Sequence, residues 1–137
     1  MEKKLKREIA ALEDLFTVVE RFCSQQRVED SVIFTMKLAG EELFTNLVRH
    51  NEGGGDHILM ELKRGDRSLV LVLTDYDVKP YDIMQTGPVD VTAPLAERSP
   101  GGLGLHLVKN VVDKLTYEYT DGTMKITAVK GLEGKHV

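Results

Sequence analysis

The stretch PGGLGLHLVKN, residues 100–110, places three glycines directly before an apolar helical pattern. Leucines and valines recur at three- and four-residue spacing from Leu103 to Leu115, which predicts a helix with one buried face. Glycines allow positive φ angles and let a ligand approach bare backbone amides. Because free N–H groups and the positive end of the helix dipole point into such a turn, it is typical of a phosphate-binding site. A glycine-rich helix entry without a ligand is the alternative.

The composition indicates a soluble globular protein. The chain has 137 residues, of which 42% are hydrophobic and 29% charged, as expected for a single domain over residues 1–137. Its net charge of −4 argues against nucleic acid or an anionic membrane surface as the main partner. No apolar run approaches the length of a membrane span. The one cysteine, Cys23, excludes an internal disulfide and a thiolate metal cluster, so a cytoplasmic protein is expected.

Two helices are predicted within the first fifty residues. Apolar side chains keep helical spacing from Leu5 to Phe22, so roughly the first two dozen residues are expected to form an amphipathic helix. A second helix is predicted to begin near residues 29–31, which supply capping and acidic side chains, and to end at about His50 before the glycine-rich segment 51–55. The buried stripe of this second helix is predicted to contain Val32, Met36, Ala39, Leu43 and Leu47.

Two β-hairpins are predicted farther along the chain. Residues 58–62 alternate between apolar and polar side chains, and residues 69–73 form a continuous apolar run after a short polar turn. A strand that is apolar on both faces is expected to lie centrally in its sheet. Residues 115–119 and 124–128 alternate in the same way on either side of a tight turn at Asp121-Gly122.

A long segment separates the two hairpins. Residues 80–100 are rich in proline and show little periodicity, and they are interpreted as a lid over a ligand. Residues 131–137 are expected to form a flexible tail. The order helix, helix, hairpin, lid, helix, hairpin predicts an α+β two-layer sandwich, with a mixed, mostly antiparallel sheet and helices on one face. A Rossmann or P-loop fold does not fit, because the glycines do not directly follow a strand and no Gly-Lys-Ser/Thr is present.

Several polar residues could bind a ligand. Glu42, Asn46 and His50 are spaced by four, so they share one helix face near the buried stripe. On a half-buried face these groups are costly unless they are bonded, and a carboxylate suits a general base while an amide oxygen suits Mg²⁺. A solvated helix face is the alternative. Asp75 ends an apolar strand, where it could accept a hydrogen bond from an amino group such as that of adenine or simply form a turn. Thr123 could add a hydroxyl to the same pocket.

Four motifs therefore follow one another along the chain: ELFTNLVRH at 42–50, Asp75, GGLGL at 101–105 and Gly122-Thr123. Their types and order resemble the GHKL (Bergerat-fold) ATPases, over nearly the whole chain. The run PLAERSPGGLGLHLV, residues 94–108, is especially similar to the small anti-sigma-factor serine/threonine-protein kinases of bacteria. The resemblance implies a histidine-kinase-like ATPase fold.

The resemblance also implies a role for each motif residue. Glu42 matches the catalytic base, Asn46 the Mg²⁺ ligand, and His50 a histidine near the phosphates. Asp75 matches the aspartate that reads the adenine amino group, and Thr123 a hydroxyl that supports adenine. The turn whose backbone amides hold the phosphate oxygens of ATP, with the lid closing over it, matches Gly101, Gly102, Leu103, Gly104 and Leu105.

The stretch after Asp75 departs from the family pattern. The family has Asp-x-Gly at this point, whereas residues 75–82 read DYDVKPYD and contain no glycine. A one-residue shift of the register would make Asp77 the functional carboxylate, so the sequence leaves both aspartates as candidates for the adenine reader.

By resemblance, the expected function is an ATP-binding anti-sigma-factor-type regulator with serine/threonine protein kinase activity that uses ATP and Mg²⁺. The expected partners are a sigma factor and a small anti-anti-sigma (STAS) protein, which the kinase phosphorylates. Homodimerisation through the N-terminal helices is a further expectation. The alternative is a non-catalytic interaction protein of the same fold with weak or no nucleotide binding. A detached ATPase domain of a sensor kinase would need a phosphoacceptor histidine on a separate helical hairpin, for which the chain has no room.

Overall fold

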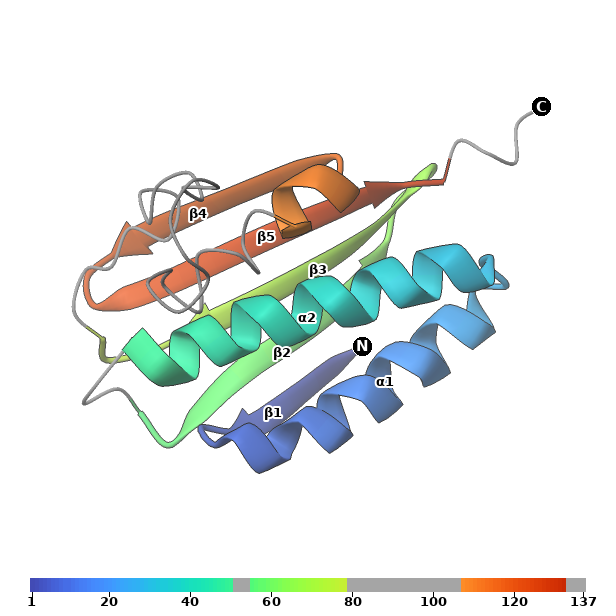
Figure 1. The fold of residues 1–137 in the computed structure, drawn as a ribbon. Helices are drawn as coiled ribbons and strands as arrows, with labels where there is room; N and C mark the ends of the chain where they lie inside the picture. Colours follow the sequence, from blue (N-terminus) through green and yellow to red (C-terminus); the bar gives the residue numbers. More distant parts are fainter. Residues whose placement is uncertain (51–54, 79–106, 133–137) are drawn as a thin grey trace, which may run out of the picture.

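The computed structural model of the chain describes residues 1–50, 55–78 and 107–132. Two helices, α1 (Leu12–Gln25) and α2 (Asp30–His50), and the helical residues 107–111 lie on one face of a sheet (Figure 1). The strands are β1 (Glu2–Lys6), β2 (His57–Arg64), β3 (Ser68–Asp75), β4 (Lys114–Thr120) and β5 (Thr123–Gly131). Their order in the sheet is β1-β2-β3-β5-β4, and all these pairings are antiparallel. The predicted α+β two-layer architecture is confirmed.

The first residues of the chain form a strand, so the expectation of a helix is wrong for residues 2–11. β1 pairs with β2 and places Leu5 opposite Ile58, and a 3-10 turn at Ile9–Ala11 leads into α1. The segment 2–8 contains a single apolar side chain, which cannot form a buried helical stripe. As a strand, the same segment buries Leu5 to 1% exposure and pairs the backbone groups of β2.

The helix α2 agrees with its prediction in bounds and in orientation. It begins at Asp30 and ends at His50, and its predicted stripe is buried, with no member more than 7% exposed. The helix α1 lies alongside α2 (Figure 1) and adds Leu15, Val19 and Phe22 to the same core. Lys37 of α2 and Glu20 of α1 form an ion pair between the two helices. Among the described residues, no helix is long and apolar enough to cross a membrane.

The strand β3 is central, as its continuous apolar run predicted. Its helix-facing row consists of Leu69, Leu71, Leu73 and Asp75, all buried. The register places Asp75 between Ile58 of β2 and Met124 of β5, which are both fully buried. A carboxylate therefore ends an apolar row beneath the helices, and this position is the starting point for the site.

The hairpin of β4 and β5 has the predicted tight turn. Asp121 and Gly122 adopt φ angles of 50° and 82°, the left-handed pair typical of a two-residue hairpin turn. The Gly122 carbonyl accepts a hydrogen bond from the Val78 N–H at 2.9 Å, and the Tyr119 hydroxyl donates to the Val78 carbonyl at 2.8 Å. These bonds fix the segment that follows β3, so that Val78 is only 5% exposed.

Candidate functional site

Asn46 lies on the buried face of α2 and is 1% exposed. Its Nδ2 donates a hydrogen bond to the backbone carbonyl of Glu42, one turn earlier in the helix, at 2.7 Å. Its Oδ1 is buried and, among the described residues, has no hydrogen-bond partner. An unpaired buried acceptor costs free energy and is rare in native proteins. The amide group therefore presents an oxygen suited to a hydrogen-bond donor or a cation beyond the described residues.

Glu42 lies one helical turn before Asn46 and is half-buried. Burial raises the pKa of its carboxyl group, the negative charge of Glu41 raises it further, and Arg49 lowers it. A carboxylate with a raised pKa binds a proton more readily than an ordinary glutamate. Glu42 therefore combines a raised pKa with a position one helical turn from Asn46, and its role as a general base stays a prediction.

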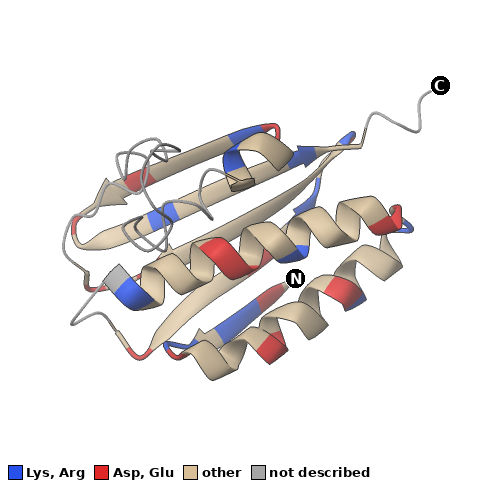
Figure 2. Ribbon diagram, in the orientation of Figure 1, with Lys and Arg blue, Asp and Glu red and all other residues tan. Residues whose placement is uncertain are grey.

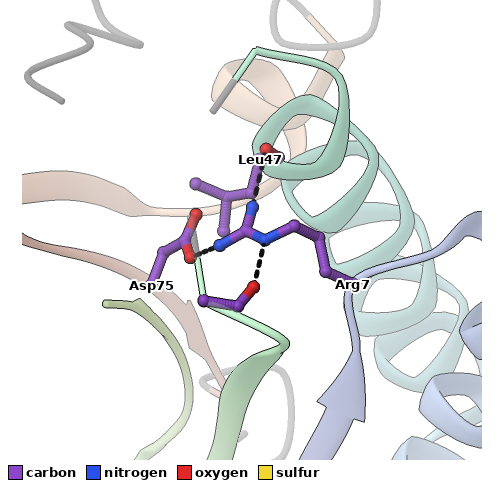
Figure 3. A network of polar contacts seen from close by, with 4 residues as sticks. Arg7, Leu47 and Asp75 are labelled. Atoms are coloured by element: carbon purple, nitrogen blue, oxygen red, sulfur yellow. Dashed lines mark hydrogen bonds and ion pairs between the residues drawn. The ribbon is translucent and has the colours of Figure 1, made fainter. Parts of the chain in front are cut away.

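Asp75 is fully buried, and its carboxylate is paired with the guanidinium of Arg7 (Figure 3). Arg7 also donates from Nε to the Gly55 carbonyl at 2.7 Å and from Nη1 to the Leu47 carbonyl at 3.3 Å. Only 13% of its side chain is exposed, and burial lowers the pKa of Arg7. The guanidinium thus joins the end of β3 to the last turns of α2, next to Asn46.

Arg7 is the residue of this site that the sequence does not reveal. It falls in the segment for which a helix was predicted, and its partner Asp75 is 68 residues away. A basic N-terminal residue carries no local signal of such a contact. The interaction depends on β1 pairing with β2, because that strand delivers Arg7 to the end of the sheet where Asp75 lies.

The structure separates the two candidate aspartates. Asp75 belongs to the buried, helix-facing row of β3, whereas Asp77 is exposed and has a φ of 58°. This left-handed conformation favours glycine, and aspartate is among the few other residues that tolerate it. Asp77 therefore stands where the Asp-x-Gly pattern has its glycine, with the same kind of backbone conformation. The geometry favours Asp75 as the base-reading carboxylate, and that role stays a prediction.

The remaining predicted residues are placed in part. Thr123 is half-buried at the start of β5 and pairs with Thr120, while the residue opposite Asp75 is Met124. His50 ends α2, and the structure describes its backbone only. The predicted lid at 80–100 and the predicted phosphate-binding turn, Gly101, Gly102, Leu103, Gly104 and Leu105, lie outside the described residues.

The outer surface of the helix layer carries a second feature, a groove between α1 and α2. Its volume is about 260 Å³, and its lining is formed by Phe16, Phe34, Lys37, Leu38 and Glu41. Phe34 is 67% exposed, which is unusual for a large apolar side chain. Charged residues of both signs are distributed along α1 and α2 (Figure 2). The groove itself combines the apolar side chains of Phe16, Phe34 and Leu38 with charged Lys37 and Glu41.

Comparison with known proteins places this arrangement in context. Residues 5–130 match the model of the histidine kinase-like ATPase domain family. The serine/threonine-protein kinase BtrW of Bordetella bronchiseptica is 27% identical over 111 residues, which cover 80% of this chain and 78% of that protein. The family match includes every described residue of the site, from Arg7 to Thr123.

Solved structures share the fold. The crystal structure of the RsbU and RsbW domains of Rv1364c from Mycobacterium tuberculosis has a TM-score of 0.68 at 14% identity, covering 96% of this chain and 32% of that one. The histidine kinase AdeS of Acinetobacter baumannii has a TM-score of 0.53 at 13% identity, covering 97% of this chain and 68% of that one. At these identities the likeness concerns the fold alone.

Proposed function

Because this chain belongs to the histidine kinase-like ATPase family, we propose that it is an anti-sigma-factor-type regulator that phosphorylates a small STAS partner on serine or threonine with Mg²⁺-ATP. The observation that carries the proposal is the buried Oδ1 of Asn46, which has no partner in the described part of the chain and lies one helical turn from half-buried Glu42. A relative named as a serine/threonine-protein kinase and a structural neighbour that contains an RsbW domain support the kinase type.

The residues present fit Mg²⁺ and ATP. Asn46 Oδ1 is a hard oxygen ligand of the kind Mg²⁺ prefers, and no described residue donates a hydrogen bond to it. When bound, Mg²⁺ neutralises charge on the ATP phosphate oxygens. In this proposal, backbone amides of residues 101–105 would hold the phosphates, and His50 would bind near them. At the other end of the nucleotide, Asp75 accepts a hydrogen bond from the adenine amino group, with Thr123 adding a hydroxyl.

In the proposed reaction, Glu42 is the general base. Its carboxylate takes the proton of the substrate hydroxyl while the hydroxyl oxygen bonds to the γ-phosphorus. The bond between that phosphorus and the bridging oxygen breaks, and ADP leaves with the electron pair. The raised pKa of Glu42 suits this role, since a base works best when its pKa lies near the working pH. Most of the rate comes from positioning and charge neutralisation.

The proposed partners are a sigma factor, the STAS substrate and a second copy of the chain, in a cytoplasmic system of bacterial transcription control. The groove between α1 and α2 supports the second copy, because exposed Phe34 gives it an apolar centre. We expect the Phe34→Asp variant to remain folded and to be monomeric in size-exclusion chromatography with light scattering. A dimer that persists in this variant would place the interface elsewhere.

A non-catalytic interaction protein remains the second candidate, and one observation favours it. Arg7 already pairs with the carboxylate that is proposed to read adenine. If this pairing excludes the base, the fold persists without useful nucleotide affinity.

Calorimetric titration with ATP, with and without Mg²⁺, followed by phosphotransfer to a STAS protein, tests the proposal. We expect Glu42→Gln to bind ATP within about threefold of the wild type and to lose phosphotransfer by at least about 100-fold, because only the base is removed. Its control is Glu118→Gln, a change of an exposed glutamate on β4 that keeps the activity. A Glu42→Gln variant that still phosphorylates would exclude Glu42 as the base. Absence of ATP binding at millimolar nucleotide would favour the non-catalytic candidate.

A further inference from the structure

Arg7 makes hydrogen bonds to three separate segments of the chain. One guanidinium contacts the Asp75 carboxylate of β3, the Leu47 carbonyl of α2 and the Gly55 carbonyl before β2 (Figure 3). Leu47 directly follows Asn46, the proposed Mg²⁺ ligand, whereas Asp75 is the proposed reader of the base. We call Glu42 and Asn46 the phosphate side of the proposed site, and Arg7 and Asp75 its base side. The position of one side relative to the other therefore depends on a side chain that directly follows the N-terminal strand.

A ligand that displaced Arg7 from Asp75 would leave two buried charges uncompensated. Asp75 is fully buried and the Arg7 side chain is 13% exposed, so breaking the pair is costly. A carboxylate has lone pairs for several hydrogen bonds, and accepting one from a guanidinium does not exhaust them. Planar guanidinium groups also fix the orientation of the carboxylate they contact, which an ammonium group does less well.

We propose that Arg7 is a positioning residue for recognition of the purine base: it holds the Asp75 carboxylate charged and oriented so that this group accepts a hydrogen bond from the amino group of adenine. This inference rests on the proposed function, because it concerns the same nucleotide site. It assigns base selectivity to a pair of residues, one of which lies outside the four motifs.

The consequence is a selectivity that depends on Arg7. ATP presents an amino group at the base position where inosine triphosphate, ITP, presents a carbonyl oxygen. An oriented carboxylate accepts from the amino group and repels the carbonyl oxygen, so wild-type protein should prefer ATP to ITP. A residue that merely anchored the fold would change the affinity for both nucleotides equally and leave their ratio unchanged.

The test measures the dissociation constants of ATP and ITP for the full chain by calorimetry, in the presence of Mg²⁺. We expect Arg7→Met to weaken ATP binding by about ten-fold. The ATP:ITP affinity ratio, which is the Kd of ITP divided by the Kd of ATP, should fall by a similar factor. Arg7→Lys retains the charge without the planar fork, so its ratio should lie between those of the wild type and Arg7→Met. The control is Arg21→Met, since Arg21 is an exposed arginine on α1.

Each outcome decides a different point. An unchanged ATP:ITP ratio in folded Arg7→Met, or tighter ATP binding in it, overturns the inference, and the second result would show that Arg7 competes with the base. Should Arg7→Met fail to fold, Arg7→Lys decides, and a wild-type ratio in it overturns the inference. If the wild-type protein binds ATP while the variants overturn the inference about Arg7, the proposed function is still supported. A wild-type protein that binds neither nucleotide overturns the proposed function and the inference together.

Discussion

On α2, the buried amide oxygen of Asn46 has no partner within residues 1–50, 55–78 and 107–132, whereas at the end of β3 the buried carboxylate of Asp75 is paired with Arg7. Both groups are at most 1% exposed, and the Leu47 carbonyl, which Arg7 contacts, lies next to Asn46 in the chain. The difference between the two regions follows from charge. A neutral acceptor can be left unpaired for about 1–3 kcal/mol, whereas a buried charge without its partner costs about 3–5 kcal/mol, a large part of the stability of a domain.

This difference distinguishes the groups that stabilise the fold from the groups that we propose to bind a ligand. On the proposed base side, Arg7 and Asp75 pair with each other within the chain, so these groups should contribute strongly to stability. The proposed phosphate side, at Glu42 and Asn46, carries an acceptor to which no described residue donates, so its groups should contribute little to stability and much to binding. Substitutions in the two regions are therefore expected to have opposite consequences.

The largest expected effect is on the base side. Asp75→Ala should lower the free energy of unfolding by about 3–5 kcal/mol, because it leaves the Arg7 guanidinium buried without its partner. Urea denaturation measures this loss. The double variant Arg7→Met/Asp75→Leu replaces the pair with apolar groups and should lose less than Asp75→Ala. Equal losses in the two variants would show that the pair contributes through packing and not through charge.

On the phosphate side, Asn46→Ala should change the free energy of unfolding by no more than about 1 kcal/mol. The variant loses the hydrogen bond from Nδ2 to the Glu42 carbonyl, but it also removes the unpaired oxygen. The same variant should lose the Mg²⁺-dependent part of ATP binding in calorimetry. A destabilisation as large as that of Asp75→Ala would identify Asn46 as a structural residue and contradict the contrast between the regions.

The elements that the sequence predicts well are those with a strong hydrophobic period. The stripe of α2 recurs over the whole helix, and the continuous run of β3 marks a strand with apolar side chains on both faces. The type, bounds and central position of these elements could therefore be predicted. Glu42 and Asn46 were predictable for the same reason, since their spacing of four places them on one face of a well-determined helix.

The segment before α1 could not be predicted from its period. Residues 2–8 contain only Leu5 as an apolar side chain, and a single position fits a strand and a helix equally well. Pairing with β2 determines that this segment forms a strand, and the paired residues are far apart in the sequence. The Arg7–Asp75 pair depends on that strand, so this pair could not be predicted from the sequence and is found only in the structure. The conformation of Asp77 could not be predicted either. The absence of glycine at this position does not show whether the aspartate there adopts a positive φ.

Asp77 allows a smaller test on the base side. Its φ of 58° lies in the left-handed region, where a side chain is disfavoured and glycine is not. Asp77→Gly should therefore raise the free energy of unfolding by about 0.5 kcal/mol, with part of the gain offset by the greater freedom of glycine in the unfolded chain. The control is Asp56→Gly, at an exposed residue that lacks a positive φ, and this change should destabilise the protein. A loss of stability in Asp77→Gly would mean that the aspartate side chain makes a contact that outweighs its backbone strain.

The smallest expected effect is a dependence of stability on pH at Glu42, a carboxylate that burial and Glu41 disfavour. Its pKa is raised in the folded protein, so the ionised form is destabilised there relative to the unfolded chain. Glu42→Gln, which cannot ionise, should therefore be slightly more stable than the wild type at pH values above the raised pKa. This advantage should shrink as the pH falls through the raised pKa and vanish below the ordinary pKa of glutamate, where both side chains are neutral in both states. Thermal unfolding of the two proteins from neutral to acidic pH measures the difference.

Phosphotransfer by the wild type should decline over the same range, because the base becomes protonated. If the advantage of Glu42→Gln grew on acidification, the pKa of Glu42 would be lowered, and the carboxylate would already have a partner, as Asp75 has.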